Sequence, residues 1–171
     1  REAQLLSQTG EESFVASGLA VTGTLRVAVL PGYFSNQASV PFPADSLQKQ
    51  LFTSNASGTI TDYYNEVSYG QLTLTGDVYS WSKVSMQASS YYGTCNGVDP
   101  GCSATGQFIE EILDLKDASV NFAQYDNDGP DGLPNSGDDD GFVDAVVIVH
   151  SLIGGECGGT ASANFISHTW A

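Results

Sequence analysis

The chain has 171 residues, and this length is enough for one domain with a sizeable core. Of these residues, 41% are hydrophobic. Twenty acidic residues face only five basic ones, so the formal net charge is −15. Such a charge argues against binding to nucleic acid or to an anionic membrane, because both select basic patches. The longest apolar run, at 145–149, is also far too short to span a membrane.

The first half of the chain alternates strand patterns with helix patterns. Residues 23–34, GTLRVAVLPGYF, predict a buried first strand that ends at a Pro-Gly pair. Residues 43–52 carry leucines at helical spacing and predict a helix. Residues 58–70 predict a second, short helix, with Thr59 as its N-cap, Asp62 three residues later and a glycine as its stop.

The second half continues this alternation. Residues 71–81 alternate in part and predict a half-exposed strand. Residues 103–117 predict an amphipathic helix, whose apolar side would hold Phe108, Ile109, Ile112, Leu113 and Leu115. Residues 141–150 show no alternation at their centre, which predicts a strand buried on both faces. A glycine-rich loop follows, and residues 165–170, FISHTW, predict a last strand.

This order of elements, β-α-α-β-α-loop-β-β, predicts one α/β domain over residues 23–171, preceded by an N-terminal extension at 1–22. No internal repeat, linker or low-complexity tract divides the chain. The pattern stops soon after the last predicted strand, without a closing helix.

The three cysteines predict one small disulfide. Cys95 and Cys102 flank the Gly/Pro-rich stretch CNGVDPGC, which predicts a disulfide hairpin ahead of the helix at 103–117. Cys157 is left over, and its alternatives are a partner on another chain, a free thiol or a buried structural thiol.

The clearest chemical feature is an acidic segment that leads directly into the predicted strand at 141–150. Seven aspartates lie within nineteen residues, and they are Asp126, Asp128, Asp131, Asp138, Asp139, Asp140 and Asp144. Like charges this close repel one another, so the segment needs a compensating cation. The donors are hard oxygens with no His or Cys nearby, which favours Ca²⁺ over Zn²⁺ and, in a Gly/Pro loop, over Mg²⁺.

The acidic segment does not fit an EF-hand. Counted from Asp126, the fifth, sixth and twelfth positions are Pro130, Asp131 and Gly137. We therefore predict an irregular calcium loop, in which an ion held in part by Asp144 would fix the start of the following strand. The alternative is a solvated acidic loop that binds no ion.

The histidines do not form a recognisable catalytic motif. His150 and His168 are the only two, and neither belongs to an H-E-x-x-H pattern. A zinc site built from His150, Glu156 and His168 is an alternative, but hydrogen-bonded structural histidines are the favoured interpretation. The motifs G-x-S-x-G, G-x-x-x-x-G-K and C-x-x-C are also absent. The residues alone therefore predict calcium binding without a complete active site.

Three segments together resemble the immune inhibitor A-like family of secreted bacterial metallopeptidases, the M6 peptidases. They are ITDYYNEVSYGQLTLTGDVYSW, VNFAQYDNDGPDGLPNSGDDDGFVDAVVIVH and ISHTW, and the resemblance runs from residue 24 to residue 170. It implies a zincin-like catalytic domain with a mixed sheet and flanking helices, secretion from bacteria, and a protein or peptide substrate. It also implies one zinc ion bound through H-E-x-x-H, whose glutamate activates the metal-bound water.

In that family the H-E-x-x-H motif normally follows the SHxW segment, and here it would begin after Ala171. The resemblance therefore implies the N-terminal part of the catalytic domain, with the calcium loop but without the zinc ligands. We expect no catalytic residue in this chain and no activity of the chain alone. The resemblance implies more weakly that His168 and Trp170 form a wall near the substrate cleft.

Two alternatives to this function stay open. One is a non-enzymatic calcium-binding or adhesion module that uses the same half-fold. The other is a processed chain that pairs with a complementary C-terminal half of the same precursor.

Overall fold

The computed structural model describes residues 22–53, 55–127, 141–157 and 165. Its strands are β1 (Gly23–Tyr33), β2 (Leu72–Val78), β3 (Ser82–Lys83) and β4 (Val146–His150). Its α-helices are α1 (Ala44–Gln48), α2 (Ile60–Val67), α3 (Ala88–Tyr92) and α4 (Thr105–Asp117). A π-helical turn follows α1 at Lys49–Thr53, and 3₁₀ turns lie at Phe122–Tyr125 and Gly155–Cys157. These elements confirm the predicted α/β class.

β1 is the central strand of a parallel sheet. β2 pairs with its first part, from Gly23 to Val29, and β4 pairs on the opposite side, from Ala28 to Gly32. The short β3 pairs with the end of β1 on the same side as β2. Every pairing among the described strands is parallel, so the mixed sheet expected from the resemblance is not found in this part of the chain. The helices between β1 and β2, and between β3 and β4, supply the crossovers that parallel pairing requires.

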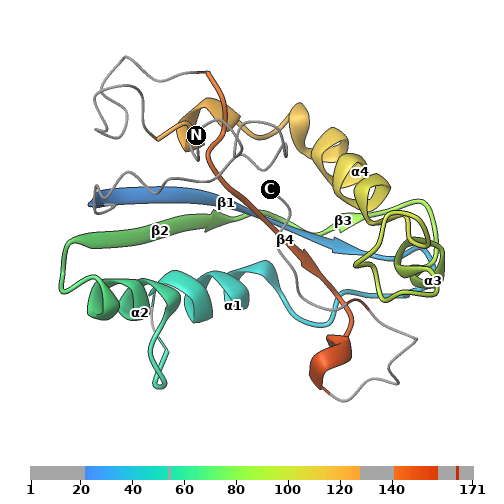
Figure 1. Cartoon of the computed structure of the whole chain (residues 1–171), viewed down its shortest axis with the longest axis horizontal. Coiled ribbons are helices and arrows are strands. Elements are labelled where there is room, and N and C mark those ends of the chain that lie inside the picture. Colours follow the sequence, from blue (N-terminus) through green and yellow to red (C-terminus); the bar gives the residue numbers. More distant parts are fainter. Residues whose placement is uncertain (1–21, 54, 128–140, 158–164, 166–171) are drawn as a thin grey trace, which may run out of the picture.

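Helices cover both faces of this sheet, so the described part of the chain has three layers (Figure 1). α1 and α2 lie along one face, where Val27 and Val29 of β1 share a core cluster with Leu47. α4 lies along the other face, where Ala28 and Leu30 belong to a second and larger cluster. Successive residues of β1 alternate between these two clusters, which explains the uninterrupted apolar run in its sequence.

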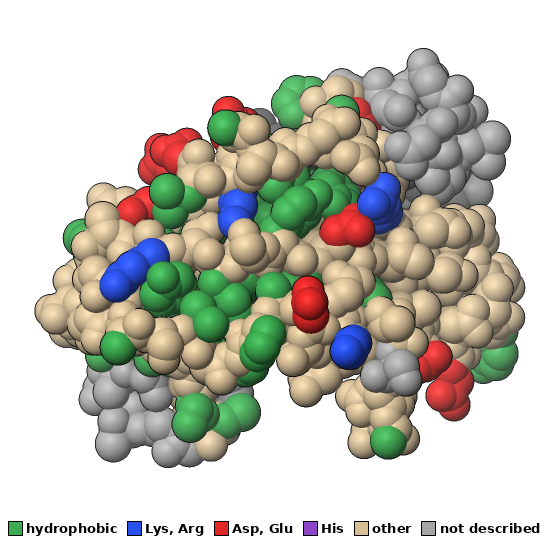
Figure 2. All heavy atoms as spheres, turned by 180° about the vertical axis from the view of Figure 1, so that it is seen from behind, with side chains coloured by type: hydrophobic (Ala, Val, Ile, Leu, Met, Phe, Trp, Pro, Cys, Tyr) green, Lys and Arg blue, Asp and Glu red, His purple; other side chains and the backbone are tan. Residues whose placement is uncertain are grey.

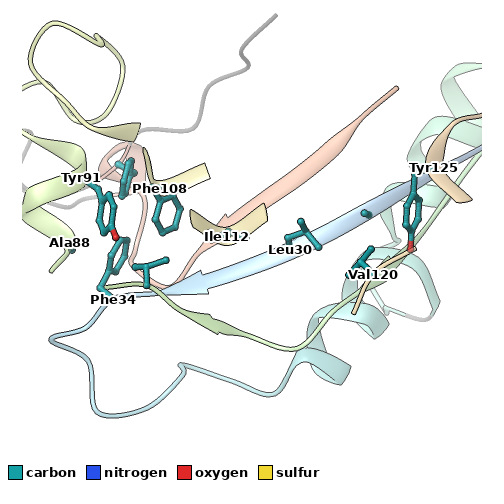
Figure 3. Close-up of a cluster of buried hydrophobic side chains, with 11 residues drawn as sticks. Leu30, Phe34, Ala88, Tyr91, Phe108, Ile112, Val120 and Tyr125 are labelled. Carbon is teal, nitrogen blue, oxygen red and sulfur yellow. The ribbon is translucent and has the colours of Figure 1, made fainter. Parts of the chain in front are cut away.

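The larger cluster gathers aromatic rings where β1 ends. The ring of Phe34 lies 5.9 Å from that of Tyr91 and 5.2 Å from that of Phe108, measured between centroids. Phe165 adds a fourth ring, 5.9 Å from Phe34. Figure 3 shows Phe34, Tyr91 and Phe108 together near the arrowhead of β1, with Leu30 farther back along the strand. We call these four rings the aromatic cluster, and it ties α3 and α4 to the carboxyl edge of the sheet.

α2 forms with the predicted cap. Thr59 Oγ1 accepts the Asp62 N–H, and Asp62 Oδ2 accepts the Thr59 N–H, which confirms the capping box. The C-terminal end of α2 differs slightly from the prediction. Tyr69 has a positive φ of 56°, in addition to Gly70, whose φ is 79°. Both of their N–H groups bond back to the last turn, so Tyr69 takes the first left-handed position that glycine usually occupies.

α4 departs from the prediction near its C-terminal end. Phe108 and Ile112 are buried as predicted, but Leu115 is exposed and Lys116 is only 7% exposed. The buried row runs in steps of four from Phe108 to Lys116, so Leu115 falls outside it. Lys116 Nζ donates to Ser80 Oγ at 2.9 Å, and burial lowers the pKa of its ammonium below the ordinary 10.5.

Replacing Lys116 with Met is expected to stabilise the protein. Met keeps the length of the buried side chain and removes the desolvated charge, so the unfolding free energy should rise by about 1 kcal/mol. Because the pKa of Lys116 is lowered on folding, the wild type should also gain stability as the pH rises toward 10.5, and the variant should lack that gain. Urea unfolding at pH 7 and pH 10 measures both effects. Lys49→Met, at an exposed lysine, is the control, and equal behaviour of the two variants would contradict the prediction.

β4 is shorter and less buried than predicted for the strand at 141–150. It begins at Val146, and Val146 and Ile148 pack against the larger cluster, while Val149 packs against the other. Val147 is exposed, so burial on both faces holds only for part of the strand. The sequence pattern missed this, because the exposure of each residue depends on which segments cover the strand.

Candidate metal centre

The structure describes only the two ends of the aspartate segment. Asp126 and Asn127 follow the 3₁₀ turn after α4, and residues 141–144 lead into β4. The remaining predicted ligands lie outside the described residues, and they are Asp128, Asp131, Asp138, Asp139 and Asp140.

Three hydrogen bonds bring these two ends together. Asp144 donates its N–H to Tyr125 O at 3.2 Å, and Asn127 donates its N–H to Asp144 Oδ2 at 2.6 Å. Gly141 donates its N–H to Asp126 Oδ2 at 2.9 Å. We call the joined residues 125–127 and 141–144 the segment base, and it fixes the chain just ahead of β4.

Asn127 is the residue of the segment base that the sequence did not single out. Its side chain is 1% exposed, with Nδ2 donating to Arg26 O at 2.9 Å and Oδ1 accepting the Arg26 N–H at 2.8 Å. Nδ2 also donates to Asp144 Oδ2 at 3.0 Å. The amide therefore takes the place of a strand residue beside β1, just before pairing with β4 begins at Ala28. A lone Asn among aspartates gives no such signal, because it fits a turn equally well.

Asp126 has the features of a buried metal ligand. It is 6% exposed, its Oδ2 accepts the Gly141 N–H, and its buried Oδ1 has no hydrogen-bond partner among the described residues. Such an oxygen is costly to bury, and a hard cation would satisfy it. Asp144 differs, since its Oδ2 accepts two hydrogen bonds from Asn127. Within the described ranges no group of three His, Cys, Asp or Glu side chains is placed to hold a metal.

A second polar cluster holds the segment base against the sheet. Asp77 Oδ2 of β2 lies 2.7 Å from the Arg26 guanidinium and accepts the Tyr125 hydroxyl at 2.9 Å. The hydroxyls of Tyr125 and Tyr79 are 2.7 Å apart. Burial, followed by the hydrogen bonds to Tyr79 and Asp77, raises the pKa of Tyr125, so its phenol stays protonated and keeps donating. The 3₁₀ turn that precedes Asp126 is thereby tied to both β1 and β2.

Of the two histidines, only His150 lies in the part of the chain that the structure describes. His150 ends β4, and its ring centroid lies 5.1 Å from that of Phe165. His168, Trp170 and the side chain of Glu156 lie outside the described residues. The zinc that the family resemblance implies therefore finds no set of ligands among the residues described, and no catalytic step is assigned to them.

The predicted disulfide is confirmed. Cys95 and Cys102 are bridged, with their Cα atoms 5.9 Å apart. Cys157 is exposed and outside this disulfide, so the alternative of a buried structural thiol is wrong.

The described surface carries mixed side chains. On the face in Figure 2, acidic side chains are scattered among apolar and uncharged ones, and the basic side chains are separated from one another. The longest described helix, α4, has 13 residues, and none of the described helices has the length and apolar composition of a membrane span.

The described residues define a parallel α/β domain in which the two ends of the aspartate segment are joined and anchored to the first strand. The family described as "Immune inhibitor A peptidase M6, catalytic domain" matches residues 42–171. The chain therefore belongs to the M6 peptidase family, which confirms the resemblance of its three segments.

Two curated relatives are similar to the chain over part of its length. It is 28% identical over 106 residues to the pre-pro-metalloprotease PrtV of Vibrio cholerae serotype O1, an alignment that covers 59% of this chain and 11% of that protein. It is 32% identical over 120 residues to immune inhibitor A of Bacillus thuringiensis subsp. alesti, covering 66% of this chain and 18% of the relative. The chain thus spans less than a fifth of either relative.

Proposed function

We propose that this chain is the N-terminal part of the catalytic domain of a secreted bacterial zinc-dependent endopeptidase, which cleaves proteins or peptides. The observation that carries the proposal is the match of the M6 catalytic domain to residues 42–171. The relative from Vibrio cholerae is called a metalloprotease, which supports a metal-dependent activity.

In this proposal the chain supplies a scaffold and not the zinc ligands. Its sequence contains no H-E-x-x-H, and its two histidines stand at positions 150 and 168. Zinc held by other residues of the parent protein would polarise the scissile carbonyl and activate a water molecule. This chain would contribute the parallel sheet and, at its carboxyl edge, Phe165, from which the chain leads to His168 and Trp170 as a wall of the substrate cleft.

We also propose that the aspartate segment binds Ca²⁺, with Asp126 as a buried ligand and the other aspartates of the segment completing the shell. The buried Oδ1 of Asp126 supports this, because it has no hydrogen-bond partner among the residues described, as does the anchoring of both segment ends by Asn127 and Asp144. Calcium suits a site of carboxylate oxygens on an irregular loop. The ion would compensate the repulsion among the aspartates and stiffen the entry to β4.

An assay on casein tests the proposed activity. The longer precursor should cleave casein, a zinc chelator should abolish the cleavage, and added Zn²⁺ should restore it, whereas the 171-residue chain alone should be inactive. Robust, chelator-sensitive cleavage by the isolated chain would instead show that His150, Glu156 and His168 form a site. Inactivity of both proteins would favour a non-enzymatic calcium-binding or adhesion module.

The same preparation tests the proposal that the chain pairs with a complementary C-terminal chain. Co-purification of a second chain from the same precursor would support processing into two parts, and one undivided precursor would contradict it.

A further inference from the structure

The disulfide loop, residues 95–102, is fastened to the start of α4. Thr105 Oγ1 donates to Gly97 O at 2.7 Å in a buried hydrogen bond. Gly97 N–H donates to Tyr92 O at 2.9 Å, and Thr94 N–H donates to Cys102 O at 3.2 Å. Because both ends of the loop are cross-linked by the disulfide, these bonds hold Gly97 between the end of α3 and the start of α4.

Gly97 lies against the ring of Phe165. A Cβ atom at this position would come within 2.5 Å of Phe165 Cδ1 and 2.9 Å of Thr105 Oγ1. The φ of Gly97 is +83°, a conformation that residues with a side chain rarely adopt. Only glycine therefore allows the disulfide loop to approach the ring this closely.

Phe165 connects the disulfide loop to the carboxyl edge of the sheet. Its side chain is 3% exposed, and its ring lies 5.4 Å from Phe108 and 5.1 Å from His150, the last residue of β4. Its carbonyl oxygen accepts the Gly155 N–H at 2.7 Å, so its backbone is held as well. Parallel α/β sheets place their functional groups at this edge, where the strands end.

We propose that the disulfide loop is a positioning element for this edge. Through Gly97 it holds Phe165, and through Phe165 it holds His150 and the residues that follow β4. The expected effect on catalysis rests on the proposed peptidase function. Reduction of the Cys95–Cys102 disulfide should then lower catalytic efficiency while the sheet stays folded. The reduction takes two electrons and two protons from a dithiol, which is itself oxidised to a disulfide.

Two glycine variants of the longer precursor separate the contact from backbone strain. Gly97→Ala adds a methyl group against Phe165, whereas Gly70→Ala adds one at a similar φ, +79°, with nothing within 4 Å. Both variants carry left-handed strain, and only the first meets the ring. We expect Gly97→Ala to lower kcat/KM on casein peptides by about tenfold or more, because small displacements near a site cost that much. Gly70→Ala should leave kcat/KM within about twofold.

The position of His150 gives a readout that does not need activity. In the isolated 171-residue chain, the ring current of Phe165 should shift the His150 Hε1 resonance, and a His168→Gln background leaves that resonance as the sole histidine signal. The signal should move in Gly97→Ala, on reduction by dithiothreitol, and in a Cys95→Ser, Cys102→Ser double variant, but not in Gly70→Ala. In a Phe165→Leu background, Gly97→Ala should lose most of its effect on kcat/KM, because the contact is gone.

The outcomes distinguish this inference from the proposed function. A wild-type precursor without activity, combined with a His150 signal that responds to Gly97→Ala and to reduction, would support the positioning and refute the peptidase. An active precursor in which Gly97→Ala and Gly70→Ala behave alike, or in which reduction changes neither kcat/KM nor the His150 signal, would overturn the positioning. If Gly97→Ala does not fold, as judged by circular dichroism, the Cys95→Ser, Cys102→Ser double variant supplies the same comparison without a dithiol that could bind zinc.

Discussion

Replacing Asn127 with leucine is expected to lower the unfolding free energy by about 3 kcal/mol, because it removes hydrogen bonds from buried groups without supplying others. The variant would leave the Arg26 N–H and Arg26 O without their partner and would remove one of the two donors to Asp144 Oδ2. Leucine has a similar volume, so the loss reports polar contacts and not a cavity.

Urea unfolding measures this effect, and Asn121→Leu is a matched control, since Asn121 is exposed and six positions earlier in the chain. The control should change the unfolding free energy by less than about 0.5 kcal/mol. Equal stability of the two variants would show that the segment base does not depend on the Asn127 amide.

Removal of Ca²⁺ is expected to lower the stability of the chain by a similar amount. A ligand that binds only the folded state stabilises it by about 2.7 kcal/mol when its free concentration is 100 times Kd. For a chain of this size, chelation with EGTA should therefore lower Tm by roughly 5–10 °C.

A substitution at Asp126 tests the calcium prediction at a single proposed ligand. Asp126→Asn keeps an oxygen for the Gly141 N–H but removes the charge, so its Tm should respond much less to added Ca²⁺. Asp114→Asn, at an exposed position of α4, should respond as the wild type does. A wild-type Tm that is unaffected by EGTA would mean that the segment is acidic without being a calcium site.

Features set by nearby residues were predictable from the sequence. The apolar run of β1, the capping box of α2 and the Cys95–Cys102 disulfide each depend on residues close together in the chain, and the structure has all three. The family was predictable as well, because the three segments that carry it are long and occur in a fixed order.

Features set by contacts between distant residues were not predictable. The α4 periodicity predicted that Leu115 is buried, whereas Leu115 is exposed and Lys116 is buried. The periodicity alone cannot show that Ser80, which is distant in the sequence, accepts a hydrogen bond from Lys116. Asn127 gained its role from Arg26, 101 positions earlier. The expected mixed sheet came from the resemblance, whereas the described strands pair only in parallel.

The metal content of the isolated 171-residue chain tests whether this chain binds calcium and lacks the zinc ligands. The chain should be loaded with equal concentrations of Ca²⁺ and Zn²⁺, dialysed, and analysed by inductively coupled plasma mass spectrometry beside the longer precursor. We expect the chain to retain calcium and no stoichiometric zinc, and the precursor to retain both. One zinc per isolated chain, or calcium in neither protein, would contradict this expectation.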